Sequence, residues 1–185
     1  AVGAVSGELV ILDSESRAEA SVSLYWRYEK WIRKRLSALD SVPGATGAIY
    51  AMRRSLTRPL PEDLLVDDMY LPLAAFREGY RAILDEAAVA YDYPTALEVE
   101  FRRKVRTLAG NYQIMRYWPE LLGWRNRMWL HFWSHKLGRL LLPFALLGMA
   151  LTSPALPMPY ATLALAGQIV FYGLAAVDPL LPEHW

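Results

Sequence analysis

The sequence predicts an α/β domain followed by a hairpin of two membrane-spanning helices. Helix-like and strand-like segments alternate through residues 1–123, which favours a layered α/β architecture. Nearly all charged residues precede Arg139, and the apolar runs 137–152 and 157–177 follow them. The second run approaches the roughly 20 residues that cross the hydrocarbon core of a bilayer. The change in composition therefore divides one chain into a soluble part and a membrane part.

The elements of the first part follow from periodicity and turn signals. Strands are expected where Val-rich or alternating residues lie between glycines and prolines, at 1–12, 47–53 and, after a turn at Gly79, up to Tyr91. Helices are expected where apolar residues repeat at helical spacing, at 14–39 and 66–78.

A further helix is expected to start at Thr95. Thr95 and Glu98 have the spacing of a capping box, and Pro94 precedes them. The apolar stripe of this helix, which we expect to face the core, consists of Leu97, Phe101, Val105, Leu108, Tyr112 and Met115.

The orientation of the membrane part follows from its flanking charges. The basic residues Arg125, Arg127, Lys136 and Arg139 precede the first apolar run, whereas the connection between the runs is uncharged. By the positive-inside rule the first part faces the cytoplasm, so the chain is expected to be an integral membrane protein. Residues 124–139 predict an amphipathic helix at the membrane surface, which gives boundaries of 1–123, 124–139 and 140–185.

Composition excludes several classes of partner and site. The net charge of +1 is too small for nucleic-acid binding, which requires a basic stripe along a phosphate backbone. The chain contains no cysteine, so disulfides and thiolate metal sites are excluded.

Asp67 and Asp68 are the candidate catalytic residues. One carboxylate of such a pair can remove a proton from an acceptor hydroxyl while its neighbour tunes the pKa. The alternative is a helix N-cap followed by an acidic residue in the first turn. Taken alone, the pair fits the structural alternative better.

Arg103 and Arg106 are candidate phosphate-binding residues. They lie three residues apart, with Gly110 four residues further on, so all three project from one helical face. A guanidinium group binds two phosphate oxygens at once, and Gly110 allows another group to approach the helix closely. The alternative is a solvated basic face paired with Glu98 and Glu100.

Two further sets of polar residues have structural interpretations. Glu29 falls within the apolar arc of the helix expected at 14–39. A carboxylate at such a position requires a partner, so we expect an ion pair with an arginine. His131 and His135 have a spacing that could bind a metal ion, but an interfacial structural role suits them better.

Taken together in their order, these segments resemble the membrane-bound family 2 glycosyltransferases, which include synthases of cellulose, hyaluronan and poly-N-acetylglucosamine. The similarity covers residues 2–111. Residues 47–54, with Gly47 and Arg53, are similar to the family's acceptor-side strand, and 66–68 match its Thr-Glu-Asp position. Residues 103–107 occupy the place of its Gln-x-x-Arg-Trp motif, with Thr107 in the Trp position.

The resemblance implies a GT-A fold and inverting transfer from a nucleoside diphosphate sugar to a glycan or lipid-linked acceptor. It implies that Asp68 is the catalytic base and that Gly47, Arg53, Arg103 and Arg106 bind substrate. It further implies a divalent metal, Mg or Mn, whose ligands belong to a donor-binding half outside this chain. The chain is therefore expected to be the acceptor half of such an enzyme, inactive alone. The missing Trp argues against processive polymerisation.

Two other functions remain open from the sequence. The first is a membrane-anchored scaffold whose carboxylates and arginines are structural. The second is a lipid-surface binding module that uses residues 124–139.

Overall fold

The computed structural model describes residues 1–12, 24–93 and 95–177, which belong to two compact units. The first unit is Ala1–Lys136 and the second is Leu137–Trp185. The division falls at the start of the apolar run 137–152. The part of the helix that we expected at 14–23 lies outside the described residues.

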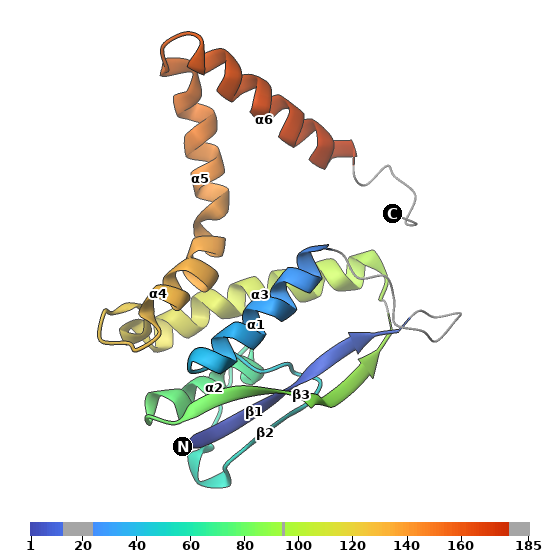
Figure 1. Cartoon of the computed structure of the whole chain (residues 1–185), viewed down its shortest axis with the longest axis vertical. Coiled ribbons are helices and arrows are strands. Elements are labelled where there is room, and N and C mark those ends of the chain that lie inside the picture. Colours follow the sequence, from blue (N-terminus) through green and yellow to red (C-terminus); the bar gives the residue numbers. More distant parts are fainter. Residues whose placement is uncertain (13–23, 94, 178–185) are drawn as a thin grey trace. The chain divides into compact units, whose positions relative to one another are not determined.

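A three-stranded sheet forms the centre of the first unit (Figure 1). The strands are β1 (Val2–Ile11), β2 (Tyr50–Met52) and β3 (Arg81–Asp92), in the order β2-β1-β3. β1 pairs antiparallel with β2 and parallel with β3. The strand expected at 47–53 is shorter than predicted because its first residues belong to a loop that reaches the helix after it.

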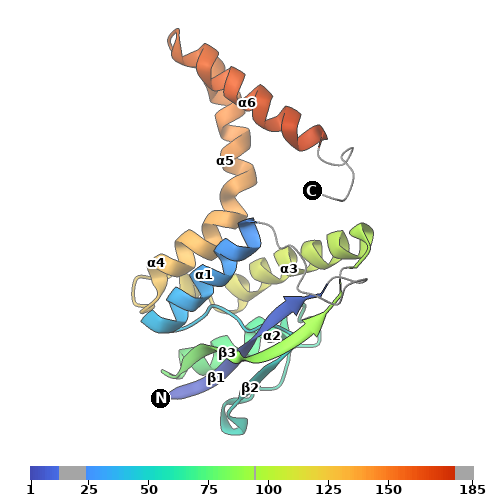
Figure 2. The same ribbon diagram turned by 45° about the vertical axis from the view of Figure 1, so that its right-hand side comes forward.

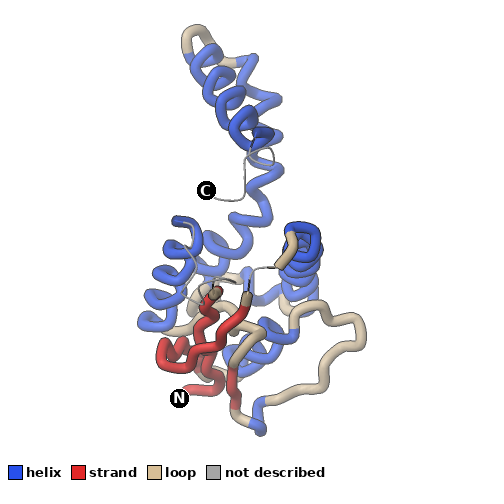
Figure 3. Tube along the Cα trace, turned by 90° about the vertical axis from the view of Figure 1, so that its right-hand side faces the viewer, coloured by secondary structure: helices blue, strands red, loops and turns tan. Residues whose placement is uncertain are grey.

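Two helices flank this sheet (Figure 3). α1 (Leu24–Leu39) lies over β1 and β3, and α2 (Asp67–Arg77) packs against β1 next to Gly3. A Cβ atom at Gly3 would lie 3.0 Å from the Cβ of Ala75 in α2, so this glycine allows the close packing. The predicted α/β architecture is confirmed.

The main core lies where α1, α2 and the C-terminal half of α3 (Leu97–Tyr117) meet. Ile114 of α3 is fully buried there. A 3-10 turn, Pro119–Leu122, follows α3 and adds Leu121 to the core. The buried residues of this cluster are Leu36, Val66, Met69, Leu73, Ala74, Phe76, Ile114, Trp118, Leu121, Met128 and Phe132.

The N-terminal half of α3 differs from the prediction. Ala96 occupies the N-cap position, so the helix begins two residues after the predicted Thr95. The predicted core-facing stripe is solvent-exposed at Phe101, Val105, Leu108 and Tyr112, whereas Met115 at its end is buried. The stripe has the expected helical period, but the core contacts the other side of the helix, at Gly110, Asn111 and Ile114.

The chain continues helically into the second unit. α4 (Trp129–His131) runs through a π-helical segment, Phe132–Leu137, into α5 (Gly138–Thr152). The helix therefore begins at Trp129 and not at the expected residue 124. α6 (Tyr160–Val177) follows α5 after the 3-10 turn Ser153–Ala155. Another 3-10 turn, Arg54–Leu56, lies in the first unit.

Two helical stretches, Trp129–Ala155 and Tyr160–Val177, are long and apolar enough to cross a membrane. Only 11% of the most apolar window of each is buried within the protein. Apolar helices with so much exposed surface suit a lipid environment, so the chain has the features of a membrane-associated protein.

Candidate functional site

Asp67 and Asp68 open α2, where the carboxylates meet the positive end of the helix dipole. Val66 occupies the N-cap position, so the N-cap alternative does not apply to either aspartate. Asp67 is exposed, whereas Asp68 is half-buried beneath the loop of residues 42–47. Asp68 is therefore the better-shielded carboxylate of the pair.

The loop of residues 42–47 is fixed to the backbone and side chain of Asp68. The amide of Ala45 donates a hydrogen bond of 2.8 Å to the carbonyl oxygen of Asp68. A Cβ atom at Gly47 would lie 3.1 Å from Oδ2 of Asp68, tighter than ordinary van der Waals contact. A glycine at this position thus lets the loop approach the carboxylate.

Ser6 and Arg33 hold the other side of the same loop. The hydroxyl of Ser6, in β1, accepts hydrogen bonds from the amide of Thr46 at 2.9 Å and from Nη2 of Arg33 at 3.0 Å. Nη2 of Arg33 also donates to the carbonyl oxygen of Gly44 at 3.4 Å. Ser6 is 2% exposed, so this contact links the sheet, α1 and the loop inside the protein.

The electrostatic environment of Asp68 combines burial with charges of both signs. Burial raises the pKa of Asp68 above its usual value, and the neighbouring carboxylate of Asp67 raises it further. Lys136 and Arg106 act in the opposite direction and lower the pKa. Burial together with both aspartates also raises the pKa of Tyr50. Asp68 is thus a carboxylate of increased basicity with two cations in its surroundings.

Arg33 belongs to the same charged group. Burial lowers the pKa of Arg33, and the carboxylates of Glu29, Asp68 and Glu8 oppose that effect. Glu29 was predicted to form an ion pair with an arginine; its Oε2 lies 3.7 Å from Nε2 of His135. Glu29 therefore has a histidine beside it as well as the charge of Arg33.

The structure brings some of the predicted site residues together and places others elsewhere. Gly47 and Arg106 lie near Asp68, as described above. Arg103 lies 3.7 Å from Glu100 in an exposed pair, as the solvated-face alternative predicts. Arg53 donates from Nε to the carbonyl oxygen of Val2 at 2.6 Å, at the opposite end of β2 from Tyr50.

Gly110 allows two helices to approach each other closely. A Cβ atom there would lie 2.5 Å from Cγ1 of Val66, the residue that precedes Asp67. The absence of a side chain at Gly110 therefore allows α3 to contact the start of α2. This contact brings the face of Arg106 toward the aspartates.

Ser6 and Arg33 are functional candidates that the sequence analysis missed. The sequence contains a pattern that indicates Arg33: it follows Glu29 by four residues, so the two side chains share one face of the helix. The position of Ser6 beneath the loop depends on pairings between distant segments, Thr46 and Arg33, which periodicity does not reveal.

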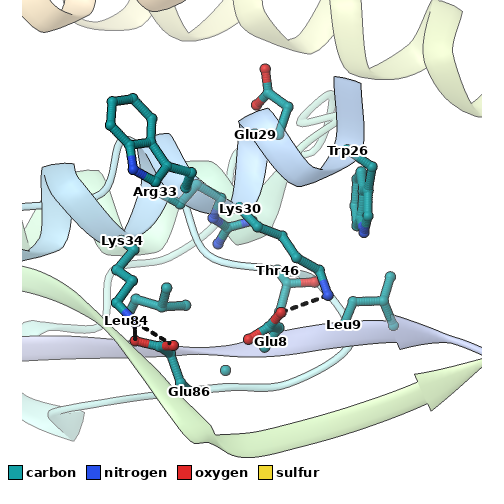
Figure 4. A pocket seen from close by; sticks show the side chains of 12 residues that line it. Glu8, Leu9, Trp26, Glu29, Lys30, Arg33, Lys34, Thr46, Leu84 and Glu86 are labelled. Carbon is teal, nitrogen blue, oxygen red and sulfur yellow. Dashed lines mark hydrogen bonds and ion pairs between the residues drawn. The ribbon is translucent and has the colours of Figure 1, made fainter. Parts of the chain in front are cut away.

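A cavity of about 370 Å³ lies between α1 and the sheet, beside this cluster (Figure 4). Apolar side chains, including Trp26, Leu9 and Leu84, line it together with charged groups. Lys30 forms an ion pair of 2.6 Å with Glu8, and Lys34 one of 2.9 Å with Glu86. Arg33 and Thr46 also line the cavity, which therefore adjoins the loop that covers Asp68.

The residues near Asp68 do not form a metal site. Among residues 1–12, 24–93 and 95–177 there is no group of three His, Cys, Asp or Glu side chains that could hold a metal ion. The aspartate pair supplies only two carboxylates, with cations nearby. The Mg or Mn ion, whose ligands the resemblance assigns to a donor-binding half outside this chain, stays an expectation.

Comparisons with protein-family models, with curated proteins and with solved structures find no match to this chain.

Proposed function

We propose that this chain forms the acceptor side of a membrane-anchored, inverting glycosyltransferase similar to those of family 2. The observation that supports the proposal most is the position of Asp68. It is a half-buried carboxylate of raised pKa beneath a glycine-containing loop, with Arg106 and Lys136 nearby. A base of this kind suits the activation of a sugar hydroxyl.

Asp68 is assigned the role of general base. It takes the proton from an acceptor hydroxyl as the hydroxyl oxygen forms a bond to the anomeric carbon of the donor sugar. The bond from that carbon to the diphosphate oxygen breaks, and its electron pair leaves with the nucleoside diphosphate. Asp67 raises the basicity of Asp68, and Arg106 provides positive charge for the developing phosphate charge.

The cavity beneath α1 is lined by Thr46 of the loop and not by Asp68, so it suits further sugar units of an acceptor and not the reacting hydroxyl itself. A sugar ring presents an apolar face of C–H groups and an edge of hydroxyl groups. Trp26 and Leu9 offer apolar surface for the first, while Glu8 and Lys30 offer hydrogen-bonding partners for the second. The acceptor is proposed to be a glycan or a lipid-linked sugar, and the donor a nucleoside diphosphate sugar.

The proposal is tested on the complete membrane protein with a panel of nucleoside diphosphate hexoses and an isolated membrane fraction as acceptor. Asp68→Asn keeps the shape of the side chain and removes the base, so transfer is expected to fall on the order of 100- to 10,000-fold. Binding of the nucleoside diphosphate is expected to persist. Undiminished transfer by the Asp68→Asn protein would exclude this residue as the base.

Asp67→Asn is the matched comparison. Its removal of a neighbouring negative charge lowers the pKa of Asp68, so the acid limb of the pH–rate profile moves to lower pH. A profile unchanged in position would contradict the coupling between the two carboxylates.

The scaffold function also has an observation in its favour. Arg103 forms an ion pair with Glu100, and Arg53 donates a hydrogen bond to the carbonyl oxygen of Val2. Both contacts are typical of arginines with a structural role. If the wild-type protein transfers sugar from none of the donors, the scaffold function is the better description.

A further inference from the structure

The stretch of α3 from residue 101 to residue 109 is exposed on every side. Each residue from 101 to 109 is exposed, although the helix contains large apolar side chains. Phe101 is 66% exposed and Val105 50%, in the middle of a regular helix. Figure 2 shows these turns, in yellow-green, standing apart from α1 and the sheet. An isolated helix of this kind is marginally stable in water, so its apolar side requires a partner.

The apolar side chains of α3 form one narrow stripe. At about 100° per residue, the positions 101, 105, 108 and 112 fall on a single line along the helix. Lys104 lies on one flank of this stripe, and Arg102 and Arg116 lie on the other. Arg103 and Arg106 project from the opposite side. α3 therefore has two faces, one toward the aspartates and one apolar with basic flanks.

We infer that this apolar face of α3 lies on the surface of an anionic lipid bilayer. Basic residues on both flanks of a narrow apolar stripe are the pattern of a helix that lies in the headgroup region. Lysine and arginine extend their charged ends toward lipid phosphates while their alkyl chains cover apolar surface. α3 carries five basic and two acidic side chains, so its charge complements an anionic surface.

The position of α3 in the chain supports a bilayer as the partner. Nζ of Lys136 lies 3.5 Å from Oδ1 of Asn111, in the C-terminal half of α3. The next residue, Leu137, begins the apolar run that is long enough to span a membrane. α3 thus contacts the last residue of the first unit, directly before the apolar run, so the chain itself tethers this helix within reach of a bilayer.

This face of α3 is separate from residues 124–139, and its binding to lipid does not require sugar transfer. The surface assigned here belongs to α3, which the sequence predicted to face the core. The competing partners are a second copy of the chain and another protein. Either would shield a fluorophore on the stripe from both water and lipid, whereas a bilayer would shield it from water alone.

The absence of cysteine makes a direct test possible. Val105→Cys places a bimane fluorophore on the apolar stripe, and Thr107→Cys places one on another exposed side of the same turns. The whole chain is reconstituted into phosphatidylcholine vesicles that contain phosphatidylglycerol. Quenching is then measured with a nitroxide-labelled lipid and with aqueous iodide.

We expect severalfold stronger quenching by the lipid nitroxide at position 105 than at 107, and the reverse order with iodide. Equal iodide quenching at both positions would overturn the proposal, since the stripe would then face water. Shielding of position 105 from both quenchers would also overturn it, because a protein would cover the stripe. Vesicles without phosphatidylglycerol test the charge contribution: undiminished contact there would refute the preference for anionic lipid.

Discussion

The carbonyl oxygen of Asp68 accepts a hydrogen bond from the amide of Ala45, and Pro72 makes that carbonyl available. In an unbroken α-helix this oxygen would accept the amide four residues later, at position 72. Proline has no amide hydrogen, so the intrahelical bond does not form. The free carbonyl instead binds the loop of residues 42–47 at 2.8 Å. A helix-breaking residue thus positions the cover of the candidate base.

Replacement of Pro72 by alanine is expected to loosen this loop. The substitution restores a backbone amide at position 72, which competes with the Ala45 amide for the carbonyl oxygen of Asp68. We therefore expect faster hydrogen exchange at the Ala45 amide, while exchange at the fully buried Ile114 stays slow. Hydrogen-exchange mass spectrometry of the two segments measures this difference. Unchanged protection of Ala45 would show that Ser6 and Arg33 alone hold the loop.

The contact between Gly110 and Val66 is expected to be intolerant of a single methyl group. A Cβ atom at position 110 would lie 2.5 Å and 2.7 Å from the two methyl groups of Val66. Gly110→Ala is therefore expected to lower the free energy of unfolding by about 1–3 kcal/mol through overpacking. This loss exceeds the gain of roughly 1 kcal/mol in helix propensity.

Chemical unfolding in detergent measures this loss, and a double variant provides its control. Val66→Ala removes the opposing methyl groups, so adding Gly110→Ala to it is expected to cost little more. A stabilising effect of Gly110→Ala in the wild-type background would contradict the close approach.

Asp68 is expected to make stability depend on pH. Its pKa is raised in the folded protein by burial and by Asp67, so ionisation of Asp68 costs stability. This cost is fully present above the folded pKa and disappears as the pH falls below the ordinary value of 3.8. Asp68→Asn is thus expected to melt at a higher temperature than wild type at neutral pH, and the difference narrows in acid.

Thermal melts at a series of pH values measure this difference. Asp67→Asn is expected to shift stability in the same direction, because it removes one of the charges that raise the pKa of Asp68. A lower melting temperature for Asp68→Asn at neutral pH would show that the attraction of Lys136 and Arg106 outweighs the cost of burial.

The sequence predicts those features of the fold that local pattern determines. The alternation of elements yields the α/β architecture, and the helix of α2 appears within one residue of its predicted bounds. The helical spacing of Arg103, Arg106 and Gly110 predicts one shared face, and the group that approaches Gly110 in the structure is the side chain of Val66. These features depend on residues near one another in the chain.

Other features of the fold depend on which distant segments of the chain pack against a given helix face or strand. The periodicity of the sequence does not encode these contacts. The stripe of Phe101 and Val105 has the period of a buried helix face, yet it is exposed in the folded chain. Ser6 and Arg33 meet only after β1, α1 and the loop assemble. Sequence pattern therefore identifies apolar faces and charged residues, and the tertiary contacts decide their partners.

The polar residue within α6 illustrates the same point and leads to a further prediction. Gln168 is the strongly polar side chain of the second apolar run, and its Nε2 donates to Oγ of Ser153 at 2.6 Å. Both residues are buried, at 7% and 2% exposure. The hydroxyl of Ser153 in turn donates to the carbonyl oxygen of Met149 at 2.6 Å. A hydrogen-bonded chain thus joins α6 to the end of α5.

Ser153→Ala is expected to destabilise this hairpin by about 0.6–2 kcal/mol, the range for hydrogen bonds between membrane helices. The loss arises mainly because the amide of Gln168 keeps its burial and loses a partner. Adding Gln168→Leu removes that unsatisfied group, so the double variant is expected to recover much of the stability. Unfolding by titration with sodium dodecyl sulfate measures the three proteins side by side. If the double variant is less stable than Ser153→Ala, Gln168 contributes through its bond to the carbonyl oxygen of Ala164, at 3.2 Å, and not through Ser153.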